Sequence, residues 1–422
     1  MSTTVSSCDP HACERRAFYG CFALLGATLT TSHFIALPVL LQMMIYTFPI
    51  LYIGSHMSLK QNEIDEITGE KANKSEAMNH TDAMLFPVFG SIALCSLYVA
   101  YKFLDASWVN FLLTLYLTAI GVVALAETLH VALMPLFPDW ANESRFSFKF
   151  CLPHIPVLCP RPDISTPEKR AEYEASCTYS LSYSQICAYL LAGVLAAVWL
   201  WKKHWAIHNL LGIAFCIQAI SLVSVGNFTV ATILLSGLFV YDIFWVFGTD
   251  VMVTVAKSFE GPAKLIFPVS LDPWAQSILG LGDIVIPGVF ISMCLRFDYW
   301  LATAAATLGA SASRAAEGTQ VKTAAAPVTN IDIHQKFSKF YFWVVVIFYE
   351  AGLLTTGVIM LVFRHPQPAL LYLVPFCLFS LFGAAALNGQ VKEVLAYRED
   401  DEDKPAEAKD AAGETTEEKK SK

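Results

Sequence analysis

Two aspartates in this sequence have the residue type and the spacing to act together as an acid and a base. Asp242 and Asp283 each lie in a stretch that is otherwise apolar enough to cross a membrane, over residues 227–248 and 276–295. An ionised carboxylate at membrane depth costs several kcal/mol at least, so such a residue indicates a function by default. The two aspartates therefore call for one explanation.

The spacing of the two aspartates supplies that explanation. If one helix ends near Phe247 and the next starts near Ser277, the two run antiparallel, and both carboxylates lie about 8–10 Å from the same membrane boundary. Carboxylates at one depth on neighbouring helices can face each other. A pair that close cannot easily ionise twice, so we expect it to share a proton at moderate pH. One carboxylate then serves as a general base for water and the other as a general acid, in either order.

The elements that must position this pair are membrane helices. The 422 residues are 55% hydrophobic and only 15% charged, which excludes an ordinary soluble globule. Apolar runs of about twenty residues recur along the chain. We expect an all-α polytopic membrane protein with nine transmembrane helices, at residues 34–54, 84–104, 108–129, 181–201, 205–225, 227–248, 276–295, 340–363 and 369–387. The eleven cysteines have no metal-ligand spacing, and no basic stripe with aromatic residues indicates nucleic-acid binding.

The predicted spans divide the chain into four regions. These are an N-terminal segment, a membrane bundle of spans one to five, a catalytic core of spans six to nine and a disordered acidic cytosolic tail, at residues 1–33, 34–225, 226–390 and 391–422. Arg15 and Arg16 followed by apolar residues 17–29 are typical either of a signal peptide or of an extended lead into the first span. Residues 299–338, rich in Ala and Thr, are expected to form a linker.

The distribution of basic residues predicts how the chain is oriented. The loops after spans one, three, five and seven, together with the tail, carry most of the Lys and Arg. The positive-inside rule therefore places the C-terminus in the cytosol and, across nine spans, the N-terminus in the lumen. The last four residues, Lys419-Lys420-Ser421-Lys422, fit the dilysine pattern that retains membrane proteins in the endoplasmic reticulum. We expect a multi-pass protein of that membrane.

Three short motifs occur in order on three apolar regions, namely Tyr241-Asp242, Gly280-Leu281-Gly282-Asp283 and Pro368-Ala369-Leu370. Each alone is a weak signal, but together in a nine-span chain they are highly specific. In this order and spacing the chain resembles the GxGD intramembrane aspartyl proteases, over roughly residues 34–397. Residues 244–260 resemble the signal peptide peptidase branch of that family rather than presenilin or the longer signal-peptide-peptidase-like proteins.

The resemblance implies a presenilin-type fold, Asp242 and Asp283 as the catalytic pair, and residues 368–370 against the active site. The implied substrates are transmembrane helices, including remnant signal peptides and type II segments, and no metal or organic cofactor is expected. Gly280 and Gly282 would let a substrate backbone approach Asp283 closely. Tyr241 could donate a hydrogen bond near the pair. Pro368 would keep the start of span nine irregular, so that its backbone could hold an unwound substrate.

Two other function classes fit parts of this pattern. A proton-coupled transporter or channel would use paired carboxylates as relay sites, but should show internal repeats, and we find none. A non-catalytic scaffold for degradation complexes would tolerate loss of both aspartates. Partners in endoplasmic reticulum degradation and homo-oligomers stay open; the lipid bilayer itself is an expected partner, and nucleic acid is not. We interpret Glu127 and Glu350 as packing or polar helix–helix contacts, and Asp298 as part of a solvated ion pair with Arg296.

Overall fold

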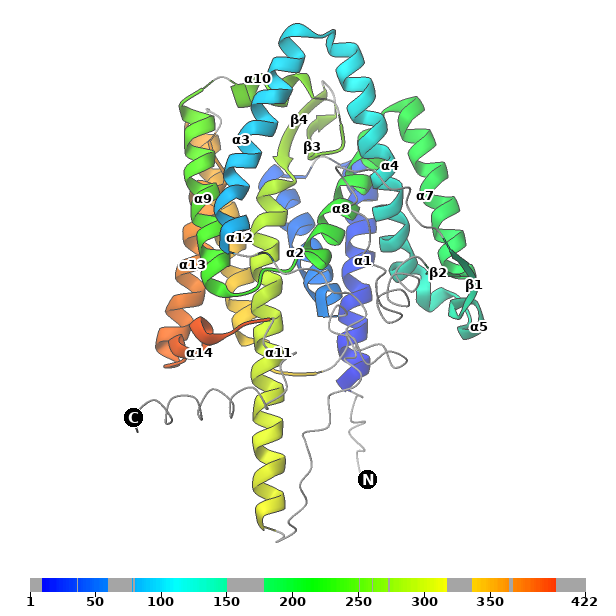
Figure 1. Ribbon diagram of the computed structural model, residues 1–422. Coiled ribbons are helices and arrows are strands. Elements are labelled where there is room, and N and C mark those ends of the chain that lie inside the picture. Colours follow the sequence, from blue (N-terminus) through cyan, green and yellow to red (C-terminus); the bar gives the residue numbers. More distant parts are fainter. Residues whose placement is uncertain are drawn as a thin grey trace, which may run out of the picture. The chain divides into compact units, whose positions relative to one another are not determined.

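The structure is a computed structural model that describes residues 10–35, 37–59, 78, 80–149, 178–249, 251–259, 261–271, 274–316, 336–363 and 367–399. Within these residues, nine helices are long and apolar enough to cross a membrane. They are α2 (Val39–Ser58), α3 (His80–Phe103), α4 (Ala106–Leu133), α7 (Tyr183–Lys202), α8 (Trp205–Leu222), α9 (Phe228–Phe247), the first part of α11 (Gly282–Ala316), α12 (Phe340–Phe363) and α13 (Leu370–Leu387). The expected all-α polytopic membrane fold is confirmed (Figure 1).

The chain forms two compact units, a larger one of residues 1–114 and 216–422 and a smaller one of residues 115–215. The smaller unit holds most of α4, η2 (Met134–Leu136), α5 (Asp139–Asn142), α7, the start of α8 and an antiparallel pair of strands, β1 (Ser144–Lys149) and β2 (Thr178–Ser182). This division differs from the predicted boundary between residues 225 and 226. The reason is that α2 packs on α11 and α3 packs on α9, so the first spans belong with the helices that carry the two aspartates.

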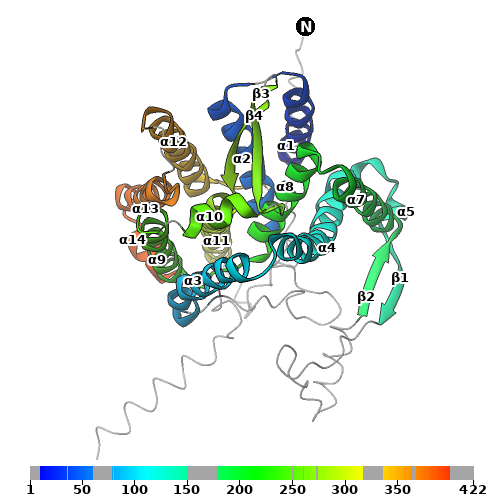
Figure 2. The same cartoon turned by 90° about the horizontal axis from the view of Figure 1, so that it is seen from above.

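Helix α11 is at the centre of the larger unit, in contact with α2, α9, α12 and α13 (Figure 2). Its packing is close at Gly288, where a Cβ atom would lie 2.5 Å from Ile220 Cδ1 and 3.1 Å from Leu51 Cδ2. A small residue here allows three membrane helices to approach one another. Asp283 is therefore carried by the most enclosed helix of this unit.

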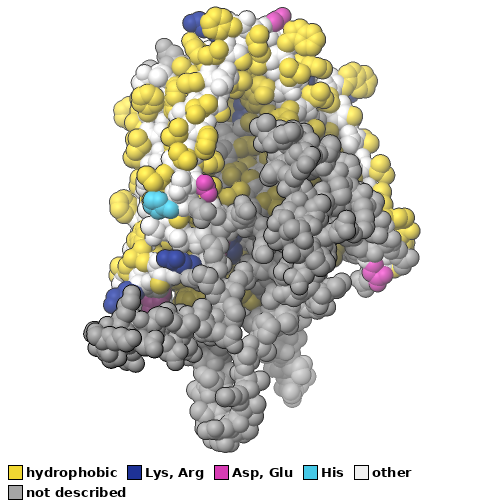
Figure 3. Space-filling view, in the orientation of Figure 1, with side chains coloured by type: hydrophobic (Ala, Val, Ile, Leu, Met, Phe, Trp, Pro, Cys, Tyr) yellow, Lys and Arg dark blue, Asp and Glu magenta, His cyan; other side chains and the backbone are white. Residues whose placement is uncertain are grey.

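Helix α3, in contrast to the enclosed α11, has a surface that is exposed and covered by large apolar side chains. Met84, Phe89 and Ile92 are 59%, 63% and 56% exposed. Figure 3 shows hydrophobic side chains over most of the described surface in that view. An apolar surface of this extent indicates contact with lipid.

Two expectations for the catalytic half are wrong. The chain between α9 and α11 contains α10 (Val251–Ser258) and a hairpin of β3 (Lys264–Leu271) and β4 (Trp274–Gly280), so residues 276–280 belong to a strand and not to a membrane helix. The expected linker of residues 299–338 is helical up to Ala316, because α11 continues through an Ala-rich sequence that favours helix. The rest of that range, up to residue 335, is outside the described residues.

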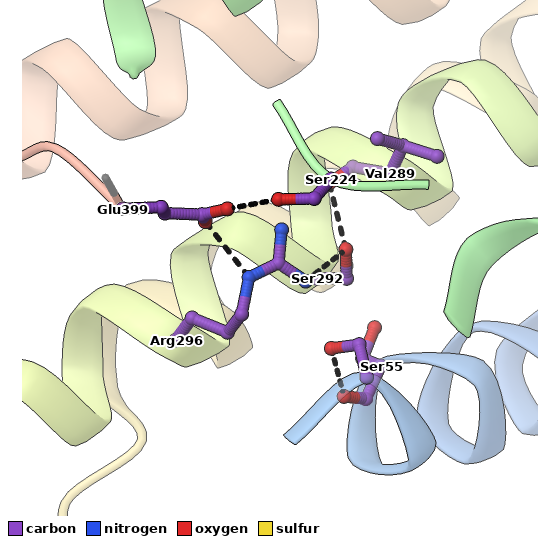
Figure 4. Close-up of polar contacts among 7 residues, drawn as sticks. Ser55, Ser224, Val289, Ser292, Arg296 and Glu399 are labelled. Atoms are coloured by element: carbon purple, nitrogen blue, oxygen red, sulfur yellow. Dashed lines mark hydrogen bonds and ion pairs between the residues drawn. The ribbon is translucent and has the colours of Figure 1, made fainter. Parts of the chain in front are cut away.

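The first residues of the predicted disordered tail are ordered. Helix α14 (Val391–Ala396) leads to Glu399, whose carboxylate binds the Arg296 guanidinium of α11 at 2.8 Å and accepts a hydrogen bond from Ser224 (Figure 4). Arg296 is only 3% exposed, and its Nη1 also donates to Ser292. A buried cation needs such a partner, which explains why this segment is fixed. Residues 400–422, including the dilysine pattern, are outside the described part of the chain.

Asp298 does not form the predicted ion pair with Arg296. Its carboxylate is buried and accepts hydrogen bonds from the backbone N–H groups of Tyr341 and Phe342, at 3.2 and 2.8 Å. These are donors of the first turn of α12 that the helix itself leaves without partners. Asp298 thus fixes the start of α12 to α11. The other two interpretations of membrane acids are confirmed, since Glu350 accepts from Thr47 and Glu127 from Tyr189, at 2.9 Å each.

The N-terminal segment contains helix α1 (Pro10–Phe34), which packs antiparallel on α2. Near its start, Glu14 forms a 2.7 Å ion pair with Lys339 and accepts a hydrogen bond from Tyr52 of α2. Lys339 is buried and lies 3.1 Å from the His56 ring. The start of α1 therefore lies at the C-terminal end of α2.

Candidate active site

The Gly280-Leu281-Gly282-Asp283 motif lies where a strand becomes a helix. Strand β4 ends at Gly280, paired with Lys264 of β3, and the Leu281 N–H donates to the Ala263 carbonyl at 3.3 Å. Helix α11 follows β4 directly in the chain (Figure 1). It begins at Gly282, so Asp283 lies in its first turn and not several residues inside a longer helix. The partial positive charge at a helix N-terminus favours a negative charge at this position.

Asp242 is held by the third motif. It lies near the C-terminal end of α9, is 5% exposed, and its Oδ2 accepts a hydrogen bond from the Leu370 backbone N–H at 3.2 Å. Leu370 is the first residue of α13, so its N–H has no partner within its own helix. Pro368 and Ala369 precede that helix. The structure therefore brings the Pro368-Ala369-Leu370 motif and Asp242 together.

The two aspartates come from adjoining helices. α9 contacts α11, and Asp242 lies near the C-terminal end of α9 while Asp283 lies in the first turn of α11. Asp283 is partly exposed, whereas Asp242 is buried. Two carboxylates in this relation cannot ionise independently, which is the condition for sharing one proton.

The two glycines of the motif differ in their surroundings. A Cβ atom at residue 280 would lie 3.2 Å from Asp283 Oδ2, which is closer than ordinary van der Waals contact. A Cβ atom at residue 282 would meet only Ile286 Cδ1, at 3.9 Å, and Gly282 is exposed. Gly280 thus leaves room for the carboxylate itself, and Gly282 leaves open space beside it.

Tyr241 does not lie as we expected. Its ring packs against Gly90 of α3, where a Cβ atom would be 3.6 Å from Tyr241 Cε2, and against Trp245, with ring centroids 6.2 Å apart. Among the described hydrogen bonds, none joins its hydroxyl to either aspartate. A different tyrosine, which sequence reasoning missed, contacts the motif: the Tyr349 hydroxyl of α12 donates to the Asp283 main-chain carbonyl at 3.2 Å.

No group of three or more His, Cys, Asp or Glu side chains in the described part of the chain could hold a metal ion. The residues that the structure gathers are instead two acids on adjoining membrane helices, with a backbone N–H directed at one and a glycine beside the other. Nine membrane helices and such an acid pair are the features of an aspartyl protease that works inside the bilayer.

Comparison with known proteins gives the same class and narrows it. The family model described as "Signal peptide peptidase" matches residues 70–401. The mouse protein named "Signal peptide peptidase" is 34% identical over 349 residues, which cover 81% of this chain and 79% of that protein. Its human counterpart is 33% identical over 336 residues, 78% and 76% of the two chains. "Intramembrane protease 2" of Caenorhabditis elegans is 37% identical over 237 residues, 55% and 46% of the two chains.

The chain belongs to the signal peptide peptidase family, a family of intramembrane aspartyl proteases. It is accordingly a multi-pass membrane protein with protease activity. This favours the protease over the transporter and the scaffold among the function classes that the motifs left open.

Proposed function

We propose that Asp242 and Asp283 are the catalytic pair and that they hydrolyse a peptide bond of a membrane-spanning helix. The observation that carries this proposal is the placement of the two carboxyl groups on the adjoining helices α9 and α11, with the Leu370 N–H bonded to one of them. No other pair of acids among the described membrane helices is placed in this way together with a glycine motif.

The chemistry follows from one proton shared by two carboxyl groups. One carboxylate takes a proton from water while the water oxygen attacks the carbonyl carbon of the scissile bond. The other carboxyl group then gives its proton to the peptide nitrogen as the carbon–nitrogen bond breaks. The products are a carboxylic acid and an amine, and the pair again holds one proton.

The backbone near the pair suits a substrate that has been opened from helix to extended strand. Among the described residues, β4 is paired only with β3, so its other edge is free to bind a further strand. Ala275, Gln276 and Ile278 of β4 are exposed, and the strand ends three residues before Asp283. Main-chain hydrogen bonds along such an edge bind an extended peptide without requiring one sequence.

For the substrates, we propose remnant signal peptides and type II membrane segments. The relatives named signal peptide peptidase support the first of these classes. The test is to reconstitute the purified protein in liposomes with a signal-peptide-like helix and to identify the products by mass spectrometry. Cleavage within the apolar part of the helix supports the proposal. Proton flux without cleavage would support the transporter instead.

The glycine motif gives a prediction with a matched control. Gly280→Ala places a methyl group against the Asp283 carboxylate, so we expect kcat to fall about tenfold or more, which is about 1.4 kcal/mol in the barrier. Gly282→Ala has space for its methyl group and should leave kcat nearly unchanged while raising KM, because it crowds the approach of substrate. Steady-state cleavage kinetics of the two variants check this. Equal effects on kcat would contradict it.

We propose the endoplasmic reticulum membrane as the location, with the C-terminus in the cytosol. The excess of Lys and Arg in the loops assigned to that side and the Lys419–Lys422 pattern support it. The prediction of a lumenal N-terminus was based on nine membrane spans. A tenth span formed by α1 would place the N-terminus on the other side of the membrane. We propose that α1 crosses the membrane beside α2 and stays in the mature protein, because its loss would leave the buried Lys339 without the Glu14 carboxylate.

This proposal predicts a cytosolic N-terminus, in line with Arg15 and Arg16 at the start of α1. An N-terminal epitope tag should react with antibody in cells whose plasma membrane alone is permeabilised, as should a C-terminal tag. A resident lumenal protein, which must stay protected, is the control. A protected N-terminal tag, or its removal by cleavage after α1, would contradict the proposal.

A further inference from the structure

The first turn of α11 lacks one of its own hydrogen-bond donors. In an α-helix the carbonyl of each residue accepts a bond from the N–H four residues later. Four residues after Asp283 comes Pro287, which has no N–H. The main-chain carbonyl of Asp283 therefore cannot receive the usual helical bond and needs another donor if it is to stay inside the protein.

Tyr349 supplies that donor from a different helix. Its hydroxyl lies 3.2 Å from the Asp283 carbonyl oxygen, and the side chain is fully buried, at 0% exposure. Tyr349 is part of α12, which packs along α11. The bond thus replaces a contact within α11 by one between helices.

The turn of α12 that carries Tyr349 is itself fixed. The next residue, Glu350, is buried and accepts a hydrogen bond from Thr47 of α2 at 2.9 Å. The turn of α12 from which Tyr349 donates is therefore also held against α2, by the bond between Thr47 and Glu350. A donor on a rigid turn restricts where the Asp283 backbone can lie.

We propose that Tyr349 is a positioning residue for Asp283, holding the first turn of α11 so that the carboxylate faces Asp242. The proposal rests on the catalytic role proposed for Asp283. Proline at residue 287 and tyrosine at residue 349 form a functional pair, because the first removes a donor and the second replaces it from outside. A displacement of about 1 Å of a catalytic group can cost about a hundredfold in rate, so a single hydroxyl at this place can control activity.

The test is a double-mutant cycle between the two residues. Tyr349→Phe keeps the ring and removes the donor, and we expect kcat to fall about tenfold to a hundredfold with KM nearly unchanged. Pro287→Ala restores an N–H four residues after Asp283. In that background Tyr349→Phe should lower kcat less than about threefold, since the helix again supplies its own donor. The same loss of rate in both backgrounds, or no loss in Tyr349→Phe alone, would overturn the proposal.

Matched controls separate positioning from packing and from a failure of the proposed function. Tyr341→Phe removes a hydroxyl from the same helix that donates to Gln390 at 2.7 Å and should leave kcat unchanged. Asp283→Asn should be inactive. If Asp283→Asn stays active, the proposed catalytic role fails; if it is inactive and Tyr349→Phe matches wild type, only the positioning role fails.

A binding measurement keeps the test decisive if Pro287→Ala does not fold. A peptide with a hydroxyethylene group at the cleavage position mimics the tetrahedral transition state, so its affinity depends on how the two carboxylates are placed. Tyr349→Phe should weaken its binding by about the same factor as it lowers kcat, and Tyr341→Phe should not. Wild-type affinity in Tyr349→Phe would overturn the proposal without reference to Pro287.

Discussion

Asp242→Asn and Asp283→Asn are each expected to lower the rate of peptide cleavage by about a thousandfold or more. Asparagine keeps the size and shape of the side chain but can neither take a proton from water nor return one to the leaving nitrogen. General acid–base catalysis by one positioned group contributes about 10²–10⁴ in rate, and each variant also removes the partner with which the proton is shared. Cleavage of a reconstituted membrane helix, followed by mass spectrometry, measures the loss.

The comparison needs a control acid that is also inside a membrane helix. Glu127→Gln is suitable, because Glu127 lies in α4 and only accepts a hydrogen bond from Tyr189 in the described structure. It should cleave at nearly the wild-type rate. In the wild type, the rate should also fall both where the pair is fully protonated and where it is fully ionised. Full activity in either aspartate variant would reject the catalytic assignment.

Glu399→Ala is expected to have the largest effect on stability, about 3 kcal/mol or more. The carboxylate is the ion-pair partner of Arg296, which is 3% exposed, and removal of one partner from a buried pair leaves the other charge uncompensated. The substitution should also loosen α14, because it removes the carboxylate that bonds Ser224 and leaves the backbone N–H of residue 399, bonded to the Gly226 carbonyl, as the remaining polar contact of that residue. Thermal unfolding in detergent micelles gives the measurement.

Two further variants make the stability test specific. Glu393→Ala changes an exposed acid of α14 and should alter the melting temperature little. Arg296→Met combined with Glu399→Leu removes both charges and should recover most of the lost stability, since an apolar pair has no charge to desolvate. If the double variant is no more stable than Glu399→Ala, the ion pair is not what fixes the C-terminal segment.

The membrane helices were predictable because their signal is local. About twenty consecutive apolar residues are needed to span the bilayer, and that length is read directly from the chain. The nine helices accordingly lie close to the predicted positions, and α12 at Phe340–Phe363 coincides with its prediction. The order of the three motifs indicated the protein family, and the match of the family model to residues 70–401 confirms that assignment.

The segment before Asp283 was predicted wrongly for a physical reason. Residues 276–281 are apolar apart from two side chains, and a short run of this kind has no periodicity that separates a strand from the start of a helix. These residues form a strand because they pair with β3. That pairing is a contact between two separate segments, so the local sequence does not reveal it. Asp283 consequently lies at a helix N-terminus and not several residues inside a helix.

By itself, then, the sequence determined the positions of nine membrane helices, the two acids and the motifs beside them, because each depends on residue type over a short stretch. Only the tertiary structure decided what holds those acids and the C-terminal segment in place. The Leu370 N–H reaches Asp242, the Tyr349 hydroxyl reaches the Asp283 backbone, and Glu399 reaches Arg296. Each of these bonds joins residues more than sixty positions apart, and packing between helices, which no local pattern records, is what brings them together.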